Sequence, residues 1–180
     1  MAAPSSETVR PTASGDRYCT EDYLTPYSRS NMFSRSCHYG LQASLFIAHE
    51  TADGGKVDLV TIATAQDIPR HFLSKILQTL VKQKLLKSTK GPNGGFELMR
   101  PAHKIYLYEI VEAIDGLDIF SQCGLGFKLC SNNHPCPIHD DFKVLRDQTK
   151  ELFNQKTLQM LIEDVRLGNS ILGLGLMKEA

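Results

Sequence analysis

The chain has 180 residues, of which 42% are hydrophobic, and its 20 lysines and arginines balance 20 aspartates and glutamates to a formal net charge of zero. This hydrophobic content is ordinary for a globular protein and allows one compact domain with a sizeable core. No apolar run approaches the roughly 18 to 20 residues that span a bilayer, and the N-terminal region lacks the charged-then-apolar order of a secretory signal. The composition therefore argues against a membrane protein, and we expect a cytoplasmic one.

The zero net charge hides an uneven distribution of charge. Residues 69–104 hold eight lysines and arginines but one acidic residue, Glu97, whereas both flanking regions carry more acids than bases. Neutralising phosphate groups requires nearby positive charge rather than net charge, so this segment favours a nucleic-acid partner. Its basic residues are Arg70, Lys75, Lys82, Lys84, Lys87, Lys90, Arg100 and Lys104.

The first part of the chain predicts an arm followed by three helices. Residues 1–31 combine prolines with many serines, threonines and charges and show no apolar period, which predicts a flexible N-terminal arm. Apolar residues recur at helical spacing from Tyr39 to about Glu50, and residues 57–66 suit a helix of two turns. After a tight turn, Pro69 is expected at the first position of a third helix, where its missing N–H costs nothing.

The third predicted helix is amphipathic and has a basic, polar outer face. Two helices joined by a short turn, the second with such a face, are typical of a helix-turn-helix unit that lays its second helix in the DNA major groove. A solvated basic face would give the same pattern. The expected apolar stripe is Phe72, Leu73, Ile76, Leu77, Leu80 and Val81, and the expected outer face is Arg70, His71, Ser74, Lys75 and Gln78.

A β-hairpin is predicted directly after this helix. Residues 85–90 and 96–100 read as strands, and the glycine-rich residues 91–95 between them read as a tight turn. A hairpin in this place is the wing of a winged helix, although a purely structural hairpin would look alike. Glycines in a wing let the backbone approach phosphates or the minor groove. The full set of expected DNA contacts is Arg35, Tyr39, Arg70, His71, Ser74, Lys75, Gln78, Ser88, Lys90, Asn93, Gly94 and Gly95.

The C-terminal part predicts two more helices on either side of a cysteine-rich loop. Residues 106–116 form an amphipathic pattern that ends in a glycine. Apolar residues from Phe142 to Phe153 recur at helical spacing in a charged segment, which predicts a helix that pairs with its copy in a second chain; packing on its own domain is the alternative. We therefore expect a mainly α fold with a small β-hairpin wing: a winged helix-turn-helix domain (32–118), a cysteine sensor loop (119–139), and a dimerisation helix with a tail (140–180).

Three of the five cysteines, Cys123, Cys130 and Cys136, lie within fourteen residues. In a cytosolic chain this clustering points to metal or redox chemistry rather than structural disulfides. Their spacings are wider than the C-x2-C turns of zinc ribbons, which favours an iron–sulfur cluster over a single zinc ion. A metal-free thiol switch and incidental cysteines are the other interpretations. Cys37 and Cys19 are expected to be bystanders.

A closed site on three thiolates needs a fourth donor, and three histidines are available. His139 follows the last loop cysteine by three residues, His134 precedes it by two, and His38 lies at the start of the first helix. Each has another interpretation. His139 could cap the following helix, His38 could pack or face DNA, and His134 could be a solvated loop residue.

Four motifs together resemble the IscR/NsrR-type winged-helix regulators of the Rrf family, over residues 32 to about 165. These are SCHYGLQA (36–43) at the first helix, IPxxFLxKILxxL (68–80) in the recognition helix, KGPNGGFxLxRP (90–101) in the wing, and EIVEAIDG (109–116) before the sensor loop. The wing and the cysteine loop together are the most specific part of the match. The chain has one more residue between Cys123 and Cys130 than the most familiar family pattern.

The resemblance implies a homodimer that binds a palindromic double-stranded DNA operator and pairs or swaps its C-terminal helices. It also implies a [4Fe-4S] or [2Fe-2S] cluster on the three loop cysteines. In one branch of the family the fourth ligand occupies the position of His139; in another it comes from the first helix of the partner subunit, at the position of His38. Both histidines are therefore candidate ligands.

The predicted function is transcriptional regulation, as a repressor that senses redox state, nitric oxide or iron–sulfur status. No enzyme is expected, because the loop lacks an accompanying phosphate cradle or catalytic triad. The alternatives are a zinc-bound or metal-free thiol-switch regulator of the same fold, a Cys/His hydrolase, and an adaptor that binds a protein partner through the winged fold.

Overall fold

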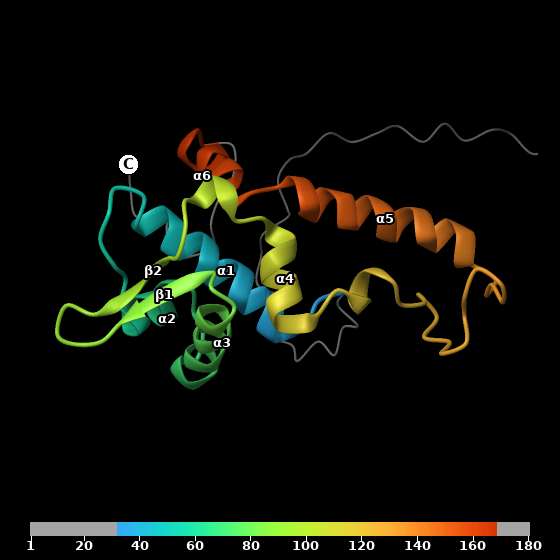
Figure 1. The fold of residues 1–180 in the computed structure, drawn as a ribbon, viewed down its shortest axis with the longest axis horizontal. Helices are drawn as coiled ribbons and strands as arrows, with labels where there is room; N and C mark the ends of the chain where they lie inside the picture. The colour runs from blue at the N-terminus through green and yellow to red at the C-terminus, as the bar shows by residue number, and fades with distance from the viewer. Residues whose placement is uncertain (1–31, 169–180) are drawn as a thin grey trace, which may run out of the picture. The chain divides into compact units, whose positions relative to one another are not determined.

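The computed structural model describes residues 32–168; the predicted N-terminal arm lies outside this range. Its elements run in the order α1 (Arg35–Glu50), α2 (Leu59–Ala65), α3 (Arg70–Lys82), β1 (Leu86–Thr89), β2 (Gly95–Leu98), the 3-10 turn η2 (Ala102–Lys104), α4 (Leu107–Asp115), the 3-10 turn η3 (Asp118–Phe120), α5 (His139–Gln155) and α6 (Leu158–Arg166) (Figure 1). The mainly helical fold with one antiparallel hairpin is as predicted.

Helix α1 begins four residues before Tyr39, where the apolar spacing placed its start. The Ser34 hydroxyl accepts a hydrogen bond from the N–H of Cys37 and so caps the helix. The N–H and hydroxyl of Ser34 donate in turn to the Asp115 carboxylate at the end of α4. The cap therefore ties the start of α1 to α4, a contact that the apolar period does not reveal.

The helix-turn-helix unit consists of α2 and α3. The Asp58 carboxylate accepts hydrogen bonds from the N–H groups of Val60 and Thr61 and caps α2. Asp67 takes a left-handed backbone conformation in the turn, with φ of 49°. Pro69 occupies the N-cap position of α3 rather than its first helical position, so the helix begins one residue later than predicted. The turn between the two helices thus spans residues 66–69.

The hairpin β1–β2 is antiparallel and pairs Leu86 with Leu98 and Thr89 with Gly95. Val57 joins it as a third pairing partner, because its N–H and carbonyl both bond to Phe96. A Cβ at Gly94 would overlap the Thr89 carbonyl, so the tight turn requires glycine at this position. The predicted wing is thus a hairpin that is paired to the start of the helix-turn-helix unit.

The main core lies between α1, α2, α3, α4 and α6. Its fully buried side chains include Ile47, Ile62, Leu77 and Ile110. A Cβ at Gly40 would overlap the side chain of Ile114, so glycine at this position lets α1 and α4 approach closely. Burial of branched apolar side chains from every helix of the winged unit provides the main stabilisation of this core.

Helix α6 is a feature that the sequence did not predict. Thr157 caps it by accepting a hydrogen bond from the N–H of Met160, and Leu158 and Ile162 are buried in the main core. It packs on α1 and η2, and the N–H of Leu158 bonds to the carbonyl of Ile105. The chain therefore returns to the winged core after α5.

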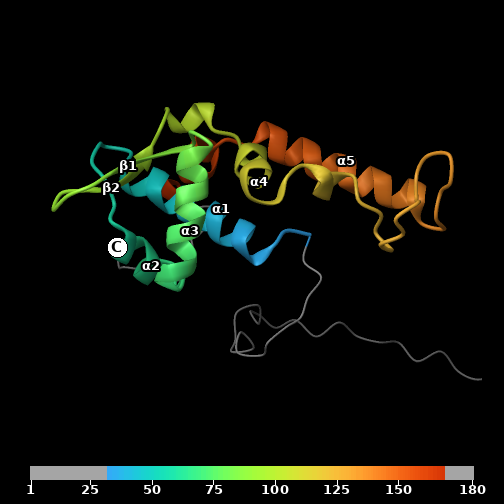
Figure 2. The same ribbon diagram turned by 60° about the horizontal axis from the view of Figure 1, so that its bottom comes forward.

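Helix α5 lies at the opposite end of the described chain from the hairpin (Figures 1 and 2). It packs on α4 and η3. A second, smaller core joins these elements to α1: Cys37, Val111 and Phe120 are buried, and Phe33 and Phe153 pack against them. This aromatic cluster is the direct contact between the first turn of α1 and the segment that leads into the cysteine loop.

Candidate cysteine centre and DNA-binding surface

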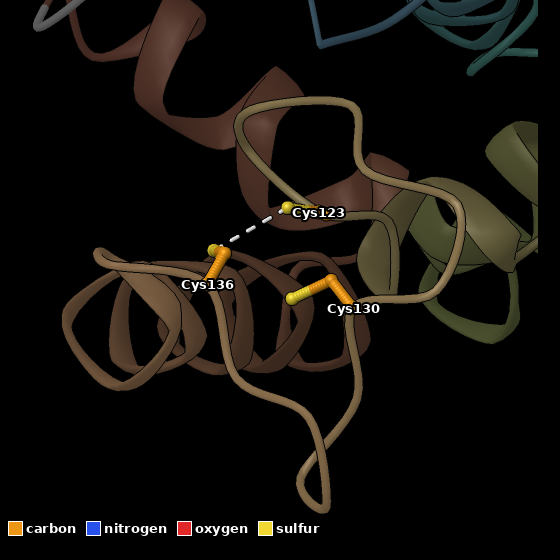
Figure 3. A group of neighbouring side chains, drawn as sticks. All are labelled: Cys123, Cys130 and Cys136. Carbon is orange, nitrogen blue, oxygen red and sulfur yellow. Dashed lines mark hydrogen bonds between the residues drawn. The ribbon is translucent and has the colours of Figure 1, made fainter.

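The thiol groups of Cys123, Cys130 and Cys136 converge in the loop between η3 and α5 (Figure 3). Their three Sγ atoms lie within 4.8 Å of one another, and the Sγ atoms of Cys123 and Cys136 are 3.5 Å apart. All three residues are partly buried. The cysteines that the sequence singled out are therefore brought together by the fold.

Arg146 of α5 anchors the first arm of the loop. Its guanidinium is buried and donates hydrogen bonds to the carbonyls of Ser121 (2.8 Å) and Gln122 (2.6 Å), immediately before Cys123. Beside it, a Cβ at Gly124 would lie 2.9 Å from ring carbons of Phe142, so the loop runs tightly over this ring. The position of Cys123 thus depends on side chains of α5.

His139 is the histidine that contacts the cysteines. It is the first residue of α5 and is 8% exposed. Its Nδ1 lies 3.1 Å from Cys130 Sγ, and its Nε2 lies 3.1 Å from Asn132 Oδ1. The amide oxygen of Asn132 only accepts hydrogen bonds, so it favours the tautomer with the proton on Nε2 and leaves the Nδ1 lone pair facing the Cys130 thiol. Both ring nitrogens have partners, and the His139 side chain makes no capping bond to α5.

The other two histidines lie apart from this contact within the described chain. His38 is half-buried on α1, with its ring centroid 6.2 Å from that of Phe33. His134 is exposed in a tight loop, where its backbone pairs with Ser131. Asn132, which orients His139, carries no sequence signal that marks it as a site residue.

Two thiols of the loop, Cys123 and Cys136, differ in acidity. The pKa of Cys123 is lowered to about 7: desolvation acts to raise it, but hydrogen bonds from the N–H groups of Leu125 and Phe127 outweigh this effect. Contacts with the thiols of Cys136 and Cys130 lower it further. The pKa of Cys136 is raised, first by desolvation and then by the neighbouring thiols. Cys123 is therefore more readily ionised at neutral pH than Cys136.

Cys37 has the opposite environment. It is fully buried, and burial together with the charge and hydrogen bond of Asp115 raises the pKa of its thiol to about 12. A thiol that stays protonated and inaccessible is neither a nucleophile nor a ready metal ligand. This environment agrees with the expectation that Cys37 is a bystander.

We expect iodoacetamide to alkylate the three loop cysteines of the chelator-treated, reduced protein at neutral pH while Cys37 stays unmodified. The thiolate is the reactive form. Among the four cysteines of residues 32–168, the three loop thiols are partly exposed, whereas Cys37 is fully buried and the pKa of its thiol is raised. Peptide mass spectrometry would identify the modified positions, and addition of denaturant, which exposes Cys37, is the control. Alkylation of Cys37 as fast as the loop cysteines in the native protein would contradict the burial described above.

Most of the expected DNA contacts fall on two neighbouring elements, α3 and the hairpin. On α3, Arg70, His71, Lys75 and Gln78 are exposed and Ser74 is half-buried. On the hairpin, the exposed residues of the set are Ser88, Lys90 and Asn93. Helix α3 and β1 pack together, and Figure 2 shows them at the same end of the described chain.

Two other basic side chains of this segment are engaged within the fold. Lys87 forms an ion pair with Glu97 at 3.1 Å, and Arg100 pairs with Glu109 and donates to the Lys104 carbonyl. Within residues 32–168, no ion pair involves the side chains of Arg70, Lys75 or Lys90. These three cations are therefore available for a phosphate partner.

The other residues expected to contact DNA lie at the start of α1 and at the hairpin turn. Arg35 is exposed at the start of α1, with its guanidinium 5.6 Å from the centroid of the Tyr39 ring. Gly94 is half-buried in the turn, and Gly95 is buried against Val57. Gly95 thus has a packing role, because a Cβ there would lie 2.7 Å from the Val57 carbonyl oxygen.

Phe72 corrects the predicted apolar stripe of α3. Its neighbours Leu73, Ile76, Leu77 and Leu80 are buried as predicted, but Phe72 is 51% exposed. Residue 72 lies on the same side of the helix as Lys75, three residues on, because α-helical residues at this spacing share a face. Simple apolar character could not distinguish this position from a core position.

Comparison with known proteins identifies the family. The model of the Rrf2 family, described as iron-dependent transcriptional regulator, matches residues 33–164. A candidate HTH-type transcriptional regulator of Aquifex aeolicus is 32% identical over 133 residues, covering 73% of this chain and 91% of that protein. The HTH-type transcriptional regulator IscR of Pectobacterium atrosepticum is 28% identical over 131 residues, with 73% and 79% covered.

Solved structures show the same fold. The global cysteine regulator CymR of B. subtilis superposes with a TM-score of 0.62 at 23% identity, covering 73% of this chain and 95% of that chain. IscR of T. potens superposes with a TM-score of 0.61 at 23% identity, covering 77% and 90%. The winged-helix fold class predicted from the sequence is confirmed by these neighbours.

The comparisons also decide the broad class of function. The relatives are transcription regulators, a non-enzymatic function, so the expectation of no enzyme is confirmed and the hydrolase alternative loses support. Among the helices of residues 32–168, none combines the length and apolar character needed to cross a membrane. The family model covers most of the chain, including the helix-turn-helix unit, the wing and the cysteine loop, and this chain is a member of the Rrf2 family of DNA-binding transcription regulators.

Proposed function

We propose that this chain acts as a homodimeric repressor whose affinity for a palindromic DNA operator depends on an iron–sulfur cluster held by Cys123, Cys130, Cys136 and His139. The observation that carries the proposal is the convergence of three thiols, one of which, Cys130, lies 3.1 Å from the imidazole nitrogen Nδ1 of His139. The family description as an iron-dependent regulator and the name IscR of a relative support iron over other metals.

The donor set fits such a cluster. Iron–sulfur clusters are bound by cysteine thiolates, with histidine replacing cysteine in some sites. A metal-ligating histidine usually donates its second ring N–H to an oxygen acceptor, and Asn132 Oδ1 accepts in this way from His139. A bound cluster would supply a centre that oxidants, nitric oxide or iron depletion can alter. These observations favour His139 over His38 as the fourth ligand within one chain.

A single zinc ion is the second candidate, and the sulfur spacing favours it. Four ligands at about 2.3 Å around a tetrahedral zinc ion place sulfur atoms ~3.8 Å apart. The Sγ atoms of Cys123 and Cys136 are 3.5 Å apart, close to this value. A [4Fe-4S] cluster, in which each cysteine binds a different iron, would require the loop to open, whereas two cysteines on one iron of a [2Fe-2S] cluster would have a similar spacing. Metal analysis therefore separates the two candidates directly.

The DNA-binding part of the proposal assigns α3 to the major groove and the hairpin to the adjacent backbone or minor groove. Recognition helices contact base edges with their N-terminal residues, which here carry Arg70, His71 and Ser74. Lys75 and Lys90, which form no ion pair among the described residues, provide positive charge for phosphates. We propose that residues 32–118 form this DNA-binding unit and that α6 completes its core.

The dimer is proposed to form through α5, within residues 140–180. Val144, Leu145 and Leu152 of this helix are each more than half exposed. Apolar side chains that repeat along one charged helix favour burial against another helix, and a second copy supplies a matching surface. Residues 119–139 then form the sensor loop between the DNA-binding unit and the dimer helix.

The fold offers a short path from the loop to the DNA-binding surface. Arg146 holds the loop carbonyls before Cys123, and Phe120 of η3 packs on Phe153 of α5. Phe33 contacts both rings and precedes the first turn of α1, which carries Arg35. A change in loop conformation would therefore alter the position of α1 and the separation of two recognition helices, which must match a DNA turn of roughly 34 to 36 Å.

The test is purification of the full chain without oxygen, followed by iron, sulfide and zinc analysis, visible absorbance and duplex binding before and after exposure to oxygen or nitric oxide. We expect iron, acid-labile sulfide, a visible absorption band and a change in DNA affinity on exposure. A colourless protein with one zinc ion per chain would support the zinc candidate. A protein that binds DNA but contains neither iron nor zinc would support the metal-free thiol-switch regulator. A protein that binds no duplex at low salt would overturn the proposal.

A further inference from the structure

An exposed aromatic ring lies within the polar outer face of the proposed recognition helix. Phe72 is the third residue of α3 and is 51% exposed. The first residues of a recognition helix are those that reach base edges. The ring of His71 lies beside that of Phe72, with centroids 4.3 Å apart. Phe72 is therefore an apolar group placed where base edges are contacted.

The ring of Phe72 also forms one wall of a hollow of about 100 Å³ between the starts of α1 and α3. The other lining residues are Arg35, Ser36, Tyr39 and Pro69. Most of this lining is apolar, and the exposed Arg35 guanidinium stands at its edge against the Tyr39 ring. The hollow thus combines an apolar interior with a cation at the rim.

The chemistry of the DNA major groove limits what such a hollow can receive. Base edges in this groove present hydrogen-bond donors and acceptors, and the thymine C5-methyl is the only apolar group among them. A polar base edge placed against Phe72 would give up hydrogen bonds to water without replacement. A methyl group placed there removes apolar surface from water on both partners, and the Arg35 guanidinium at the rim can neutralise a nearby phosphate.

We propose that Phe72 and the hollow between α1 and α3 form a reading site for the C5-methyl group of one thymine in the operator. The proposal rests on the DNA-binding function proposed above and adds a base-specific contact to it. Phe72 acts as a specificity-determining residue, because it distinguishes a methylated pyrimidine edge from the polar edges of the other bases. Its contribution involves no charge.

The test begins with duplexes that the full-length protein selects from a random pool. Each thymine of the selected site is replaced in turn by deoxyuridine, which removes only the methyl group. We expect one thymine position to respond, with affinity falling about fourfold, the factor that corresponds to one buried methyl group. Replacing that base pair so that 5-methylcytosine carries the methyl group at the same place should preserve more affinity than unmethylated cytosine does.

The Phe72→Ala variant provides the matched comparison. It should bind the thymine and deoxyuridine duplexes with equal affinity, about fourfold below the unmodified pair, whereas Phe72→Leu should keep part of the discrimination. The salt dependence of binding should be unchanged in both variants, because every phosphate keeps its cationic partner. Circular dichroism would verify folding, which is expected because Phe72 is half exposed.

Several results would overturn the inference. Duplex binding that is insensitive to deoxyuridine at every position, or a selected site without thymine, would exclude methyl reading. Equal sensitivity to deoxyuridine in the wild type and in Phe72→Ala would assign the methyl contact to another residue. A protein that binds no duplex at low salt would instead overturn the proposed function itself, so the two failures are distinguishable.

Discussion

We expect the Cys130→Ser variant to bind metal more than about 100-fold more weakly than the wild type. Removing a residue that only orients a metal ligand weakens binding less, by roughly 10- to 100-fold. Cys130 lies beside His139 Nδ1 and belongs to the three-thiol group, so its replacement removes one donor and the neighbour of another. Serine keeps the size of the side chain but not the soft thiolate that iron and zinc prefer. Iron, sulfide and zinc content after anaerobic purification and dialysis would measure the decrease.

Two further variants sharpen this prediction. Asn132→Ala removes the acceptor for His139 Nε2 and should weaken metal retention by about 10- to 100-fold, less than Cys130→Ser does. His134→Ala changes an exposed histidine of the same loop and should leave metal content unchanged. Retention of a full complement of metal by Cys130→Ser, or equal decreases in all three variants, would exclude the proposed ligand set.

The second large effect is expected for Lys75 and Lys90, two lysines of the proposed DNA-binding surface. Lys75→Ala on α3 and Lys90→Ala at the start of the hairpin turn should each weaken duplex binding and lower the slope of log affinity against log salt by about 0.9 for each phosphate that is no longer neutralised. Neither lysine has an ion-pair partner within residues 32–168, so the effect should appear in DNA binding rather than in stability. Fluorescence anisotropy with a labelled duplex over a salt series would measure both the affinity and the slope.

Lys104→Ala is the matched control for the change in charge. Lys104 belongs to the same basic segment but lies in η2, which packs against α6 rather than against the helix-turn-helix unit. Replacing Lys104 by alanine should leave the slope of log affinity against log salt unchanged. If Lys104→Ala reduced the slope as much as Lys75→Ala, the charge of the whole segment, and not the surface of α3 and the hairpin, would govern binding.

Local sequence patterns were sufficient to predict the helices and the hairpin of the winged unit. Periodic apolar residues predicted α1 and α4, and the glycine-rich turn at 91–95 predicted the hairpin, because these patterns reflect helical and strand geometry over a few residues. The predicted helix boundaries were less accurate. Helix α1 begins before the first residue of its apolar period because Ser34 caps it. Helix α6 was missed although Leu158, Leu161, Ile162 and Val165 recur at helical spacing; its return to the main core depends on contacts with elements far away in the sequence.

Sequence patterns likewise predicted one part of the cysteine centre and did not reveal another. The spacing of Cys123, Cys130 and Cys136 and the nearby histidines predicted a metal site and left His38 and His139 as alternatives. The contact of His139 with Cys130, its orientation by Asn132 and the anchoring of the loop by Arg146 depend on how α5 packs against the loop. Such contacts between a helix and a loop leave no periodic trace in the sequence.

By itself, the sequence determined the class of fold, the position of the basic segment and the identity of the three clustered thiols, because each depends on residue type and on spacing along the chain. The tertiary structure decided which histidine contacts one of those thiols and that Phe72 leaves the apolar stripe to line a hollow with α1. It also decided which cations remain unpaired on the described surface. The physical reason is that exposure, tautomer and ion pairing are properties of neighbours in space, and those neighbours are set only when the helices pack.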